Sequence, residues 1–417
     1  MFPGFSAALS ALSADSNAID VCGNNLANLN TPGFKAAQVE FSDLMSETLG
    51  GALNPAQVGM GVGPIGTNTN YIQGGITTTN GPTDAAIEGN GFFVVQNQNG
   101  QTLYTRDGSF QVDSAGNLVT ASGQYVQGWL ATNGTVSPNG PLSNLTVPAG
   151  ALIPGTTTTT MSVDVNLNAG APTSGAGSSF SAPIQVFDSL GAGHTLTIDF
   201  TNTGANSWSY TVAVPASDLS SGGKTTLASG TLTFDGNGNL TSPAAGSGPQ
   251  PIAIQGLADG ANDMSINWNL FNATGTSNIT QLSETSSLES ETQNGAAPGQ
   301  ITSVSLQNGG LLVANYTNGQ RVTVGQLAVA AIQNPESLIS VGENNLLASA
   351  GTAPPVVGAA NSAGRGQILA GSLEGSTSDM AAEFTNLLTY ERSYQAAGRV
   401  ITTGDTMIQD TLNLIQG

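Results

Sequence analysis

The sequence predicts a mainly β protein with α-helical termini, in which nested sandwich- or barrel-like β-domains lie between two helical ends. Apolar residues recur at heptad-like intervals near both ends of the 417-residue chain, which is typical of amphipathic helices. Short alternating runs bounded by Gly, Asn and Asp, such as "NGFFVVQN" and "GTLTFDGNGNL", fill the middle of the chain. Such runs are typical of strands in sandwiches and barrels.

Both helical ends carry a stripe of apolar residues. Neither stripe covers enough surface to stabilise an isolated helix in water, so each helix needs a partner. Two arrangements fit the pattern: the ends pair like a coiled coil within one molecule, or they stay loose in the monomer and pack only in an assembly. The positions expected to make these axial contacts are Phe5, Leu9, Leu12, Ile19, Leu26, Phe384, Leu387, Tyr394, Ile401, Ile408, Leu412 and Ile415.

Shifts in composition indicate the domain organisation. Sequence rich in Thr, Ser and Gly begins near "PGTTTTTMSV" and ends near "ETQNGAAPGQ", which brackets an inserted domain. The β-segments on either side would then form one domain from two pieces of chain. The expected ranges are 1–30 and 372–417 for an axial helical domain, 31–71 and 361–371 for a connector, 72–146 and 293–360 for an inner β-domain, and 147–292 for an outer β-domain.

The charge balance excludes two classes of partner. The net charge is −20, from 27 acidic and only 7 basic residues, and the basic residues are not clustered. Binding to nucleic acid or to an anionic membrane surface needs such clusters, so we expect neither. No apolar stretch approaches the length of a membrane span, and the N-terminus lacks the basic segment of a signal peptide. We therefore expect neither membrane insertion nor a cleaved signal peptide.

The chain has one histidine and one cysteine, which restricts the chemistry available to it. His194 and Cys22 cannot build a His/Cys metal centre, and no spacing of carboxylates singles out an acid/base pair. We expect Cys22 to be a small buried residue of a helix and His194 to be a surface residue at the start of a strand. The sequence thus predicts no catalytic, cofactor or metal site, and no enzyme activity.

Two motifs resemble ligand sites but lack essential parts. Residues 61–66, "GVGPIG", match a dinucleotide-binding pattern, yet Pro64 and the "TNTN" that follows oppose the helix that this site requires. We interpret this segment as an irregular connector. Residues 235–239, "DGNGN", begin like a calcium-binding loop but lack its later Gly and Glu, so they predict a hairpin turn.

The segment "NNLANLNTPGFK", residues 24–35, ends the first helical pattern in a run of asparagines. Asparagine is a poor helix former, because its side chain competes for backbone hydrogen bonds. A residue that precedes proline is pushed out of the helical region, so Thr31 should lie outside the helix. Pro32 and Gly33 then fit the two central positions of a type II turn.

Three segments together resemble one family. "NNLANLNTPGFK" is similar to the N-terminal signature of the bacterial flagellar rod and hook proteins. "VGMGVGPIGTNTNYIQGGITTTNGPTDAAIEGNGFFVV" resembles the stretch that follows, and "LLTYERSYQAAGRVITTGDTMIQDTLNLI" resembles the C-terminal helix. The residues that carry the motif are Asn25, Leu26, Ala27, Asn28, Thr31, Gly33, Phe34, Arg392, Tyr394 and Asp405.

The resemblance implies a structural protein of the flagellum. The long central insertion favours the hook members of the family over the shorter rod members. Such a subunit polymerises with copies of itself into a curved hollow tube, which acts as a universal joint between rod and filament and transmits torque in motility. The implied partners are the flagellar rod, the hook cap, the hook–filament junction protein and the flagellar type III export apparatus. The implied location is the extracellular flagellum, reached without a cleaved signal peptide.

Two alternatives remain open at the level of sequence. The chain could be a distal rod protein or a hook-associated axial protein of the same family. It could instead be a secreted β-rich adhesin, which would explain the Thr-, Asn- and Gly-rich middle. An adhesin would not explain the matched apolar stripes at the two ends.

Overall fold

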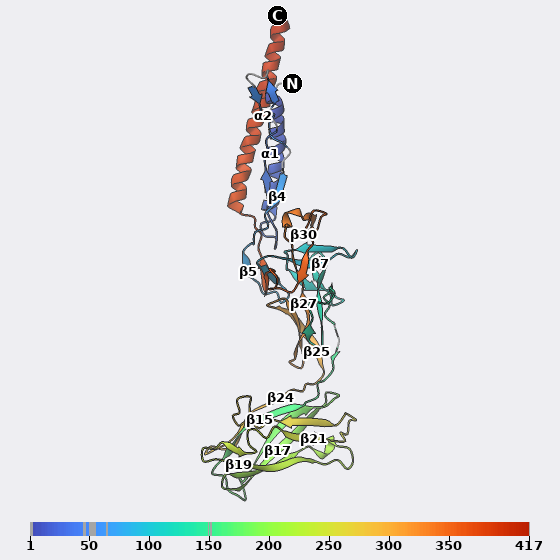
Figure 1. Cartoon of the computed structure of the whole chain (residues 1–417), viewed down its shortest axis with the longest axis vertical. Coiled ribbons are helices and arrows are strands. Elements are labelled where there is room, and N and C mark those ends of the chain that lie inside the picture. Colours follow the sequence, from blue (N-terminus) through green and yellow to red (C-terminus); the bar gives the residue numbers. More distant parts are fainter. Residues whose placement is uncertain are drawn as a thin grey trace. The chain divides into compact units, whose positions relative to one another are not determined.

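The computed structural model describes residues 3–44, 47–49, 56–63, 66–148, 150 and 152–416. The chain forms two compact units. The first unit comprises 1–149, 303–314 and 321–417, and the second comprises 150–302 and 315–320. Strands β25 (Gly299–Gln307) and β26 (Leu311–Tyr316) each pass from one unit to the other. Strands dominate both units and a helix lies at each end of the chain, so the expected fold class is confirmed (Figure 1).

The first unit contains both helices, α1 (Pro3–Ala27) and α2 (Met380–Gln416). Its strands before the second unit are β1 (Ala37–Glu40), β2 (Glu47–Leu49), β3 (Ala56–Val58), β4 (Gly66–Thr69), β5 (Ile76–Thr78), β6 (Ala85–Glu88), β7 (Phe92–Gln96), β8 (Thr102–Thr105), β9 (Phe110–Val112), β10 (Leu118–Thr120), β11 (Tyr125–Thr132), β12 (Thr135–Val136) and β13 (Ser143–Asn144). Its later strands are β27 (Arg321–Leu327), β28 (Val329–Ala331), β29 (Ile339–Gly342), β30 (Asn345–Leu347), β31 (Val356–Gly358), β32 (Gln367–Ala370) and β33 (Ser372–Glu374).

The two helices pair within the molecule and run antiparallel. Asn25, near the end of α1, contacts Glu383, near the start of α2. Phe5, near the start of α1, shares a groove with Met407, near the end of α2. Figure 1 shows the C-terminal end of α2 extending beyond the start of α1. Of the two arrangements that fit the sequence, this chain has the intramolecular pairing. Neither helix, as far as it is described, has the length and hydropathy needed to cross a membrane.

The buried face of α1 consists of small and polar residues. Four of its five most buried side chains lie at the heptad-like spacing 15, 18, 22 and 25. Cys22 is among them, which confirms the expectation that it is a small buried residue. Small side chains let two helices approach closely, so this face suits a tight helix pair. The buried residues of α1 are Ala8, Ala14, Asp15, Ala18, Cys22 and Asn25.

Both helix boundaries follow local rules. Asp379 caps the start of α2, because its Oδ1 accepts the backbone N–H groups of Ala381 and Ala382 at 2.8 and 3.0 Å. The other boundary lies at Ala27, where the asparagine-rich run begins to replace the helix. The end of α1 and the start of α2, which lie together at one end of the helix pair, therefore fall where the sequence pattern changes.

A β-ribbon and a mixed set of strands complete the first unit. Strands β1 and β4 pair antiparallel. The main sheet runs in the order β26-β27-β11-β7-β8-β30-β29. Strand β7 is a continuous apolar run, "FFVV", and all four residues are buried because both faces of the strand are covered. Phe93 packs edge-on against Phe110, with ring centroids 5.1 Å apart.

The second unit is built from two five-stranded sheets around one core. One sheet has the order β21-β22-β15-β23 with β24 on β15, and the other has the order β16-β17-β18-β19-β20. The strands are β14 (Leu152–Ile153), β15 (Thr160–Asn168), β16 (Ser179–Phe187), β17 (Gly193–Gly204), β18 (Ser207–Ala213), β19 (Thr226–Phe234), β20 (Leu240–Ser242), β21 (Gln250–Ile254), β22 (Met264–Trp268), β23 (Ile279–Leu282) and β24 (Ser287–Gln293).

The expectation that His194 is a surface residue is wrong. His194 lies at the start of β17, where every second residue faces the core. It therefore falls on the same face as Leu196, Ile198 and Phe200, and only 6% of it is exposed. The Gly turn before it suggested an exposed strand end, but the strand alternation decides the direction of the side chain.

The turn expected at residues 235–239 is confirmed. It joins β19 to β20, which pair antiparallel. Asp235 Oδ1 accepts the backbone N–H groups of Asn237 and Asn239 at 2.9 and 2.8 Å. An aspartate that bonds to the backbone two and four residues later is typical of such turns.

The core of the second unit should depend strongly on Trp268. Its ring is fully buried between Phe200 and Tyr210, at centroid distances of 6.5 and 5.2 Å. We expect Trp268→Ala to lower the free energy of unfolding of this unit by about 3–5 kcal/mol, because burial is lost and a cavity remains. Urea unfolding of the full chain, followed by circular dichroism, measures the change. The control Leu190→Ala removes an exposed side chain and should change stability by less than about 0.5 kcal/mol. Equal effects of the two substitutions would contradict this assignment of the core.

Candidate functional site

The candidate site lies where the end of α1, the turn after it, the segment before α2 and the main sheet meet. We call it the helix-base junction. It brings together residues more than 250 positions apart in the sequence. The residues that define it are Asn25, Gly33, Lys35, Arg106, Glu374 and Glu383.

Asn25 connects three elements through a side chain that is 1% exposed. Its Nδ2 donates to Glu383 Oε1 of α2 at 2.9 Å and to the carbonyl oxygen of Ala37 in β1 at 2.7 Å. Its Oδ1 accepts the backbone N–H of Ala37 at 3.1 Å. Only a carboxamide offers donors and an acceptor in this arrangement, which explains why asparagine stands here despite its poor helix propensity.

The other motif residues form the exit from α1. Asn28 Nδ2 donates to the carbonyl of Asn24 at 2.9 Å, and Thr31 Oγ1 donates to Asn28 Oδ1 at 3.0 Å. The backbone N–H of Phe34 donates to the carbonyl of Thr31 at 3.3 Å, which closes a turn centred on Pro32 and Gly33. Since the φ of Gly33 is +68°, the expected type II turn is confirmed.

Gly33 is required for a second reason besides its backbone conformation. A Cβ atom at this position would lie 2.5 Å from the backbone carbon of Arg106 and 2.5 Å from the backbone nitrogen of Asp107. The backbone N–H of Gly33 also donates to the carbonyl of Glu374 at 2.8 Å. The turn is thus in close contact with the sheet on one side and with the segment before α2 on the other.

Glu374 is the centre of the junction, and its side chain is fully buried. One carboxylate oxygen accepts from Lys35 Nζ at 2.6 Å and from the backbone N–H of Gly74 at 2.8 Å. The other accepts from Arg106 Nη1 at 3.0 Å. Two of the seven basic residues of the chain are therefore used by one carboxylate. A buried carboxylate requires such partners, because an unpaired buried charge is strongly unfavourable.

The two cations are also bound to backbone oxygens. Arg106 donates to the carbonyls of Ile87 at 3.2 Å and Gly89 at 2.7 Å, and Lys35 donates to the carbonyl of Ile72 at 2.7 Å. Burial lowers the pKa of both Lys35 and Arg106, and the ion pairs with Glu374 oppose that shift. These contacts connect the turn, the main sheet and the base of α2 as one unit.

Two titratable residues lie inside the helix pair. Burial raises the pKa of Asp15, and a hydrogen bond with Ser393 of α2 opposes the shift. Burial, followed by the nearby Glu383, raises the pKa of the Cys22 thiol to about 12. The thiolate fraction of Cys22 is therefore far lower while α1 stays against α2 than in an exposed cysteine.

The predicted axial residues lie beside the most buried face rather than on it. Phe5, Leu12, Ile19 and Leu26 of α1 and Leu387 and Ile401 of α2 are half-buried. Leu9, Phe384, Tyr394, Ile408 and Leu412 are exposed, and the side chain of Ile415 lies outside the described residues. The structure thus leaves a large part of the predicted contact set uncovered in the single chain.

The motif residues divide into two groups. Asn25 and Gly33 belong to the junction, Asn28 and Thr31 form the helix exit, and the carbonyl of Phe34 accepts the N–H of Thr377 at 3.1 Å. Leu26 is half-buried. Ala27 and the three C-terminal motif residues are exposed. Those exposed C-terminal residues are Arg392, Tyr394 and Asp405.

Sequence reasoning missed Glu374, Arg106 and Glu383. Each is a single charged residue in an unremarkable stretch, and its partner is far away in the chain. The scarcity of basic residues was the one available signal, because in such a chain a buried carboxylate must recruit one of very few cations. That signal indicates that a pair exists without indicating which residues form it.

We expect Glu374→Gln to destabilise the first unit by about 3–5 kcal/mol, because Lys35 and Arg106 are then buried without a counter-charge. Chemical denaturation of the full chain, with hydrogen exchange to locate the affected unit, measures the change. The matched control is Glu336→Gln, which neutralises an exposed glutamate of the same unit. If both variants unfold at the same denaturant concentration as the parent, Glu374 does not have this role.

Cys22 reports on whether α1 stays packed. With a pKa of about 12, roughly one thiol in ten thousand is ionised at pH 8, and the thiolate is the reactive form. We expect iodoacetamide to modify the folded monomer at least ~100-fold more slowly than the urea-unfolded chain. Since the chain has one cysteine, mass spectrometry gives the rate without ambiguity. Comparable rates in the two states would mean that α1 is detached in the monomer.

Four family models match the chain in order. They are the flagella basal body rod protein over residues 5–35, the flagellar hook protein FlgE/F/G D1 domain over 86–166, the flagellar basal body protein FlaE D2 domain over 166–296, and the flagellar basal body rod FlgEFG protein C-terminal region over 369–414. The first and last of these cover the two motif segments that meet in the first unit.

Whole-length relatives agree with these matches. The flagellar hook protein FlgE of Escherichia coli K12 is 33% identical over 421 residues, covering 98% of this chain and 99% of that protein. That of Treponema pallidum is 32% identical over 446 residues, covering 95% and 96%. The crystal structure of Helicobacter pylori flagellar hook protein FlgE2 gives a TM-score of 0.49 at 15% identity and covers 70% of this chain and 99% of that one. The identity to these relatives over nearly the whole chain confirms the expected family. This chain belongs to the flagellar hook protein family.

Proposed function

We propose that this chain is the structural subunit of a bacterial flagellar hook and that it polymerises with copies of itself into a curved, hollow tube. The observation that carries the proposal is the exposed apolar surface of α2 in the single chain. Met407 is 67% exposed and Leu414 is 82% exposed. The other large apolar residues exposed along α2 are Met380, Phe384, Leu388, Tyr394, Val400, Ile408 and Leu412. Exposed apolar surface of this extent along a helix is a surface for association.

A groove near the end of the helix pair supports the same proposal. It has a volume of about 730 Å³ and lies open between Phe5 and the last turns of α2. Val400, Met407 and Ile408 line it. An apolar helix face of a second copy fits this chemistry, and each copy would offer a groove at one place and a face at another. Contacts of this kind that do not close into a ring generate a helical polymer.

The domains would take different parts in such a tube. The axial helices at 1–30 and 372–417 would line the interior, and the segments 31–71 and 361–371 would connect them to the β-domains. The inner domain, 72–146 and 293–360, and the outer domain, 147–292, would form the surrounding layers. A surface with few charges suits contacts that slide as a rotating joint bends, because no fixed ion pairs resist the shift.

The family relationship supports a set of partners and a location. We propose that the polymer joins the flagellar rod to the filament, contacts the hook cap and the hook–filament junction protein, and transmits torque rather than catalysing a reaction. We further propose that the chain reaches the extracellular flagellum through the type III export apparatus, without a cleaved signal peptide.

The test removes apolar surface from the end of α2 without touching the junction. We expect the triple variant Met407→Gln, Leu412→Gln and Leu414→Gln to remain folded but to lose hooks and motility, because these side chains are exposed in the single chain. Electron microscopy of basal bodies and a swimming assay in cells that carry only this variant give the result. The control variant, Thr402→Gln with Thr406→Gln, alters exposed polar positions of the same helix and should assemble. Hooks of normal length and number in the triple variant would refute the proposal.

A further inference from the structure

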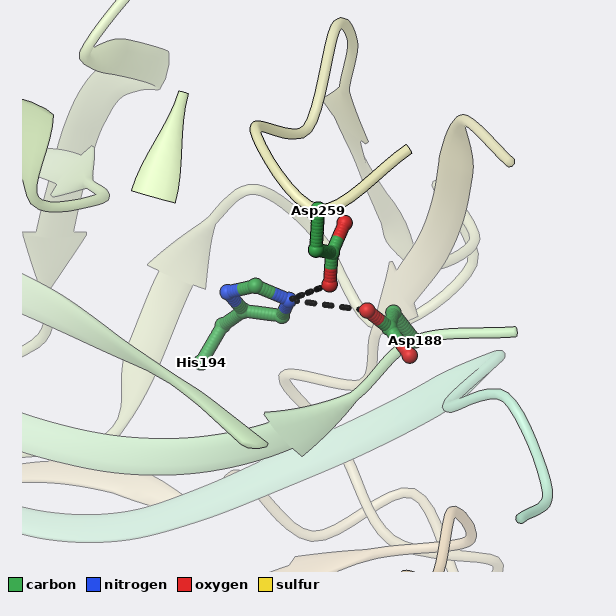
Figure 2. A group of neighbouring side chains, drawn as sticks. All are labelled: Asp188, His194 and Asp259. Atoms are coloured by element: carbon green, nitrogen blue, oxygen red, sulfur yellow. Dashed lines mark hydrogen bonds and ion pairs between the residues drawn. The ribbon is translucent and has the colours of Figure 1, made fainter. Parts of the chain in front are cut away.

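The second unit contains a cluster of one histidine and three aspartates, all from different segments of the unit. His194 Nε2 lies 3.1 Å from Asp188 Oδ2 and 3.8 Å from Asp259 Oδ2, and Figure 2 shows both carboxylates directed at this nitrogen. His194 Nδ1 lies 3.1 Å from Asp218 Oδ2 on the other side of the ring. The Nε2 atom and the two carboxylate oxygens beside it lie within 4.8 Å of one another.

Backbone hydrogen bonds hold the two carboxylates in place. Asp188 Oδ1 accepts the N–H groups of Leu190 and Ala192 at 2.8 and 2.9 Å, and Asp188 is fully buried. Asp259 Oδ1 accepts the N–H of Ala261 at 3.0 Å. In each carboxylate one oxygen is thus occupied by the backbone, and the other is turned toward His194. This division orients the second oxygen as a ligand for a cation.

Asp218 lies beside the second ring nitrogen. In the tautomer of the neutral imidazole that carries its proton on Nδ1, Asp218 Oδ2 accepts that proton at 3.1 Å and Nε2 presents its lone pair between the other two carboxylates. Histidines that bind metals commonly donate their second N–H to a carboxylate in this way, which orients the ring and makes it a better ligand. Asp218 therefore corresponds to the outer partner of a metal-bound histidine.

The cluster carries an excess of negative charge. Three carboxylates surround one imidazole, so even a protonated His194 leaves the group net negative. A divalent cation would balance the charge more completely than a single proton.

We propose that His194 Nε2, Asp188 and Asp259 bind a divalent transition-metal ion of the Zn²⁺ type. Tetrahedral zinc with nitrogen and oxygen ligands at about 2.0–2.1 Å places neighbouring ligand atoms about 3.3 Å apart, close to the 3.1 and 3.8 Å observed here. Water would complete the coordination, since the Asp259 side chain is 32% exposed and opens the site to solvent. One imidazole and two carboxylate oxygens favour zinc over calcium or magnesium, which prefer oxygen ligands in larger numbers.

The site would stabilise the second unit by connecting the β16–β17 hairpin of one sheet to the β21–β22 loop of the other. Asp188 follows β16, His194 opens β17, and Asp259 lies between β21 and β22. The inference is independent of the proposed hook function, because every group it uses lies inside the second unit. The sequence predicted no metal site, because it does not show that residues 188 and 259 come close together in the fold.

Zinc titration of the full chain tests the proposal, after treatment with a chelator and buffer exchange. We expect one ion to bind per chain by calorimetry. Asp259→Asn and His194→Gln should each weaken binding at least ~100-fold, and Asp218→Asn should weaken it about 10- to 100-fold. Asp259 lies in an exposed loop, so its variant should keep the circular dichroism spectrum of the parent. The control is Asp235→Asn, an aspartate with the same turn contacts but no histidine beside it, which should bind like the parent.

The single histidine provides a second readout that does not depend on affinity. In protein with ¹⁵N-labelled histidine, zinc should shift the Nε2 resonance while Nδ1 stays protonated. Magnesium at the same concentration should leave both resonances unchanged. Absence of saturable zinc binding, parent-like affinity in Asp259→Asn, or a His194 that stays doubly protonated in excess zinc would each overturn the proposal.

Discussion

The buried carboxylate of Glu374 is the interaction on which the arrangement of the first unit depends. It binds Lys35 from the segment after α1 and Arg106 from the sheet, and it lies in β33, six residues before α2 begins. A charge inside the protein must be fully paired, so these three segments cannot separate without exposing or stranding an ion. The position of both helices relative to the sheet follows from this requirement.

Asn25 extends that constraint into the helix pair. Its carboxamide binds Glu383 of α2 and both backbone groups of Ala37, so the ends of α1, α2 and β1 are held together by one buried side chain. Gly33 then lets the chain turn sharply against the backbone of Arg106, where any side chain would collide. The asparagine-rich end of α1 is thus a joint between helix and sheet, and its weak helix propensity is compensated by tertiary hydrogen bonds.

The helix pair combines a closed interface with exposed apolar surface. Small residues such as Ala18 and Cys22 are buried between the helices, whereas large apolar residues of α2, including Met407 and Leu414, are exposed. Close packing of small residues needs little apolar area, so it leaves the larger side chains free for other contacts. This division explains how a chain can fold as a monomer and still carry the surface that the proposed polymer requires.

The sequence by itself determined the fold class, the family, the end of α1 and the turns at Pro32–Gly33 and at residues 235–239. These features depend on steric and hydrogen-bonding preferences within a few residues, which a sequence displays directly. Tertiary structure decided which helix face is buried, that Glu374 meets Arg106 across 268 positions, and that His194 faces the core with Asp188 and Asp259. These contacts depend on which strands and helices become neighbours, and long-range packing sets that choice.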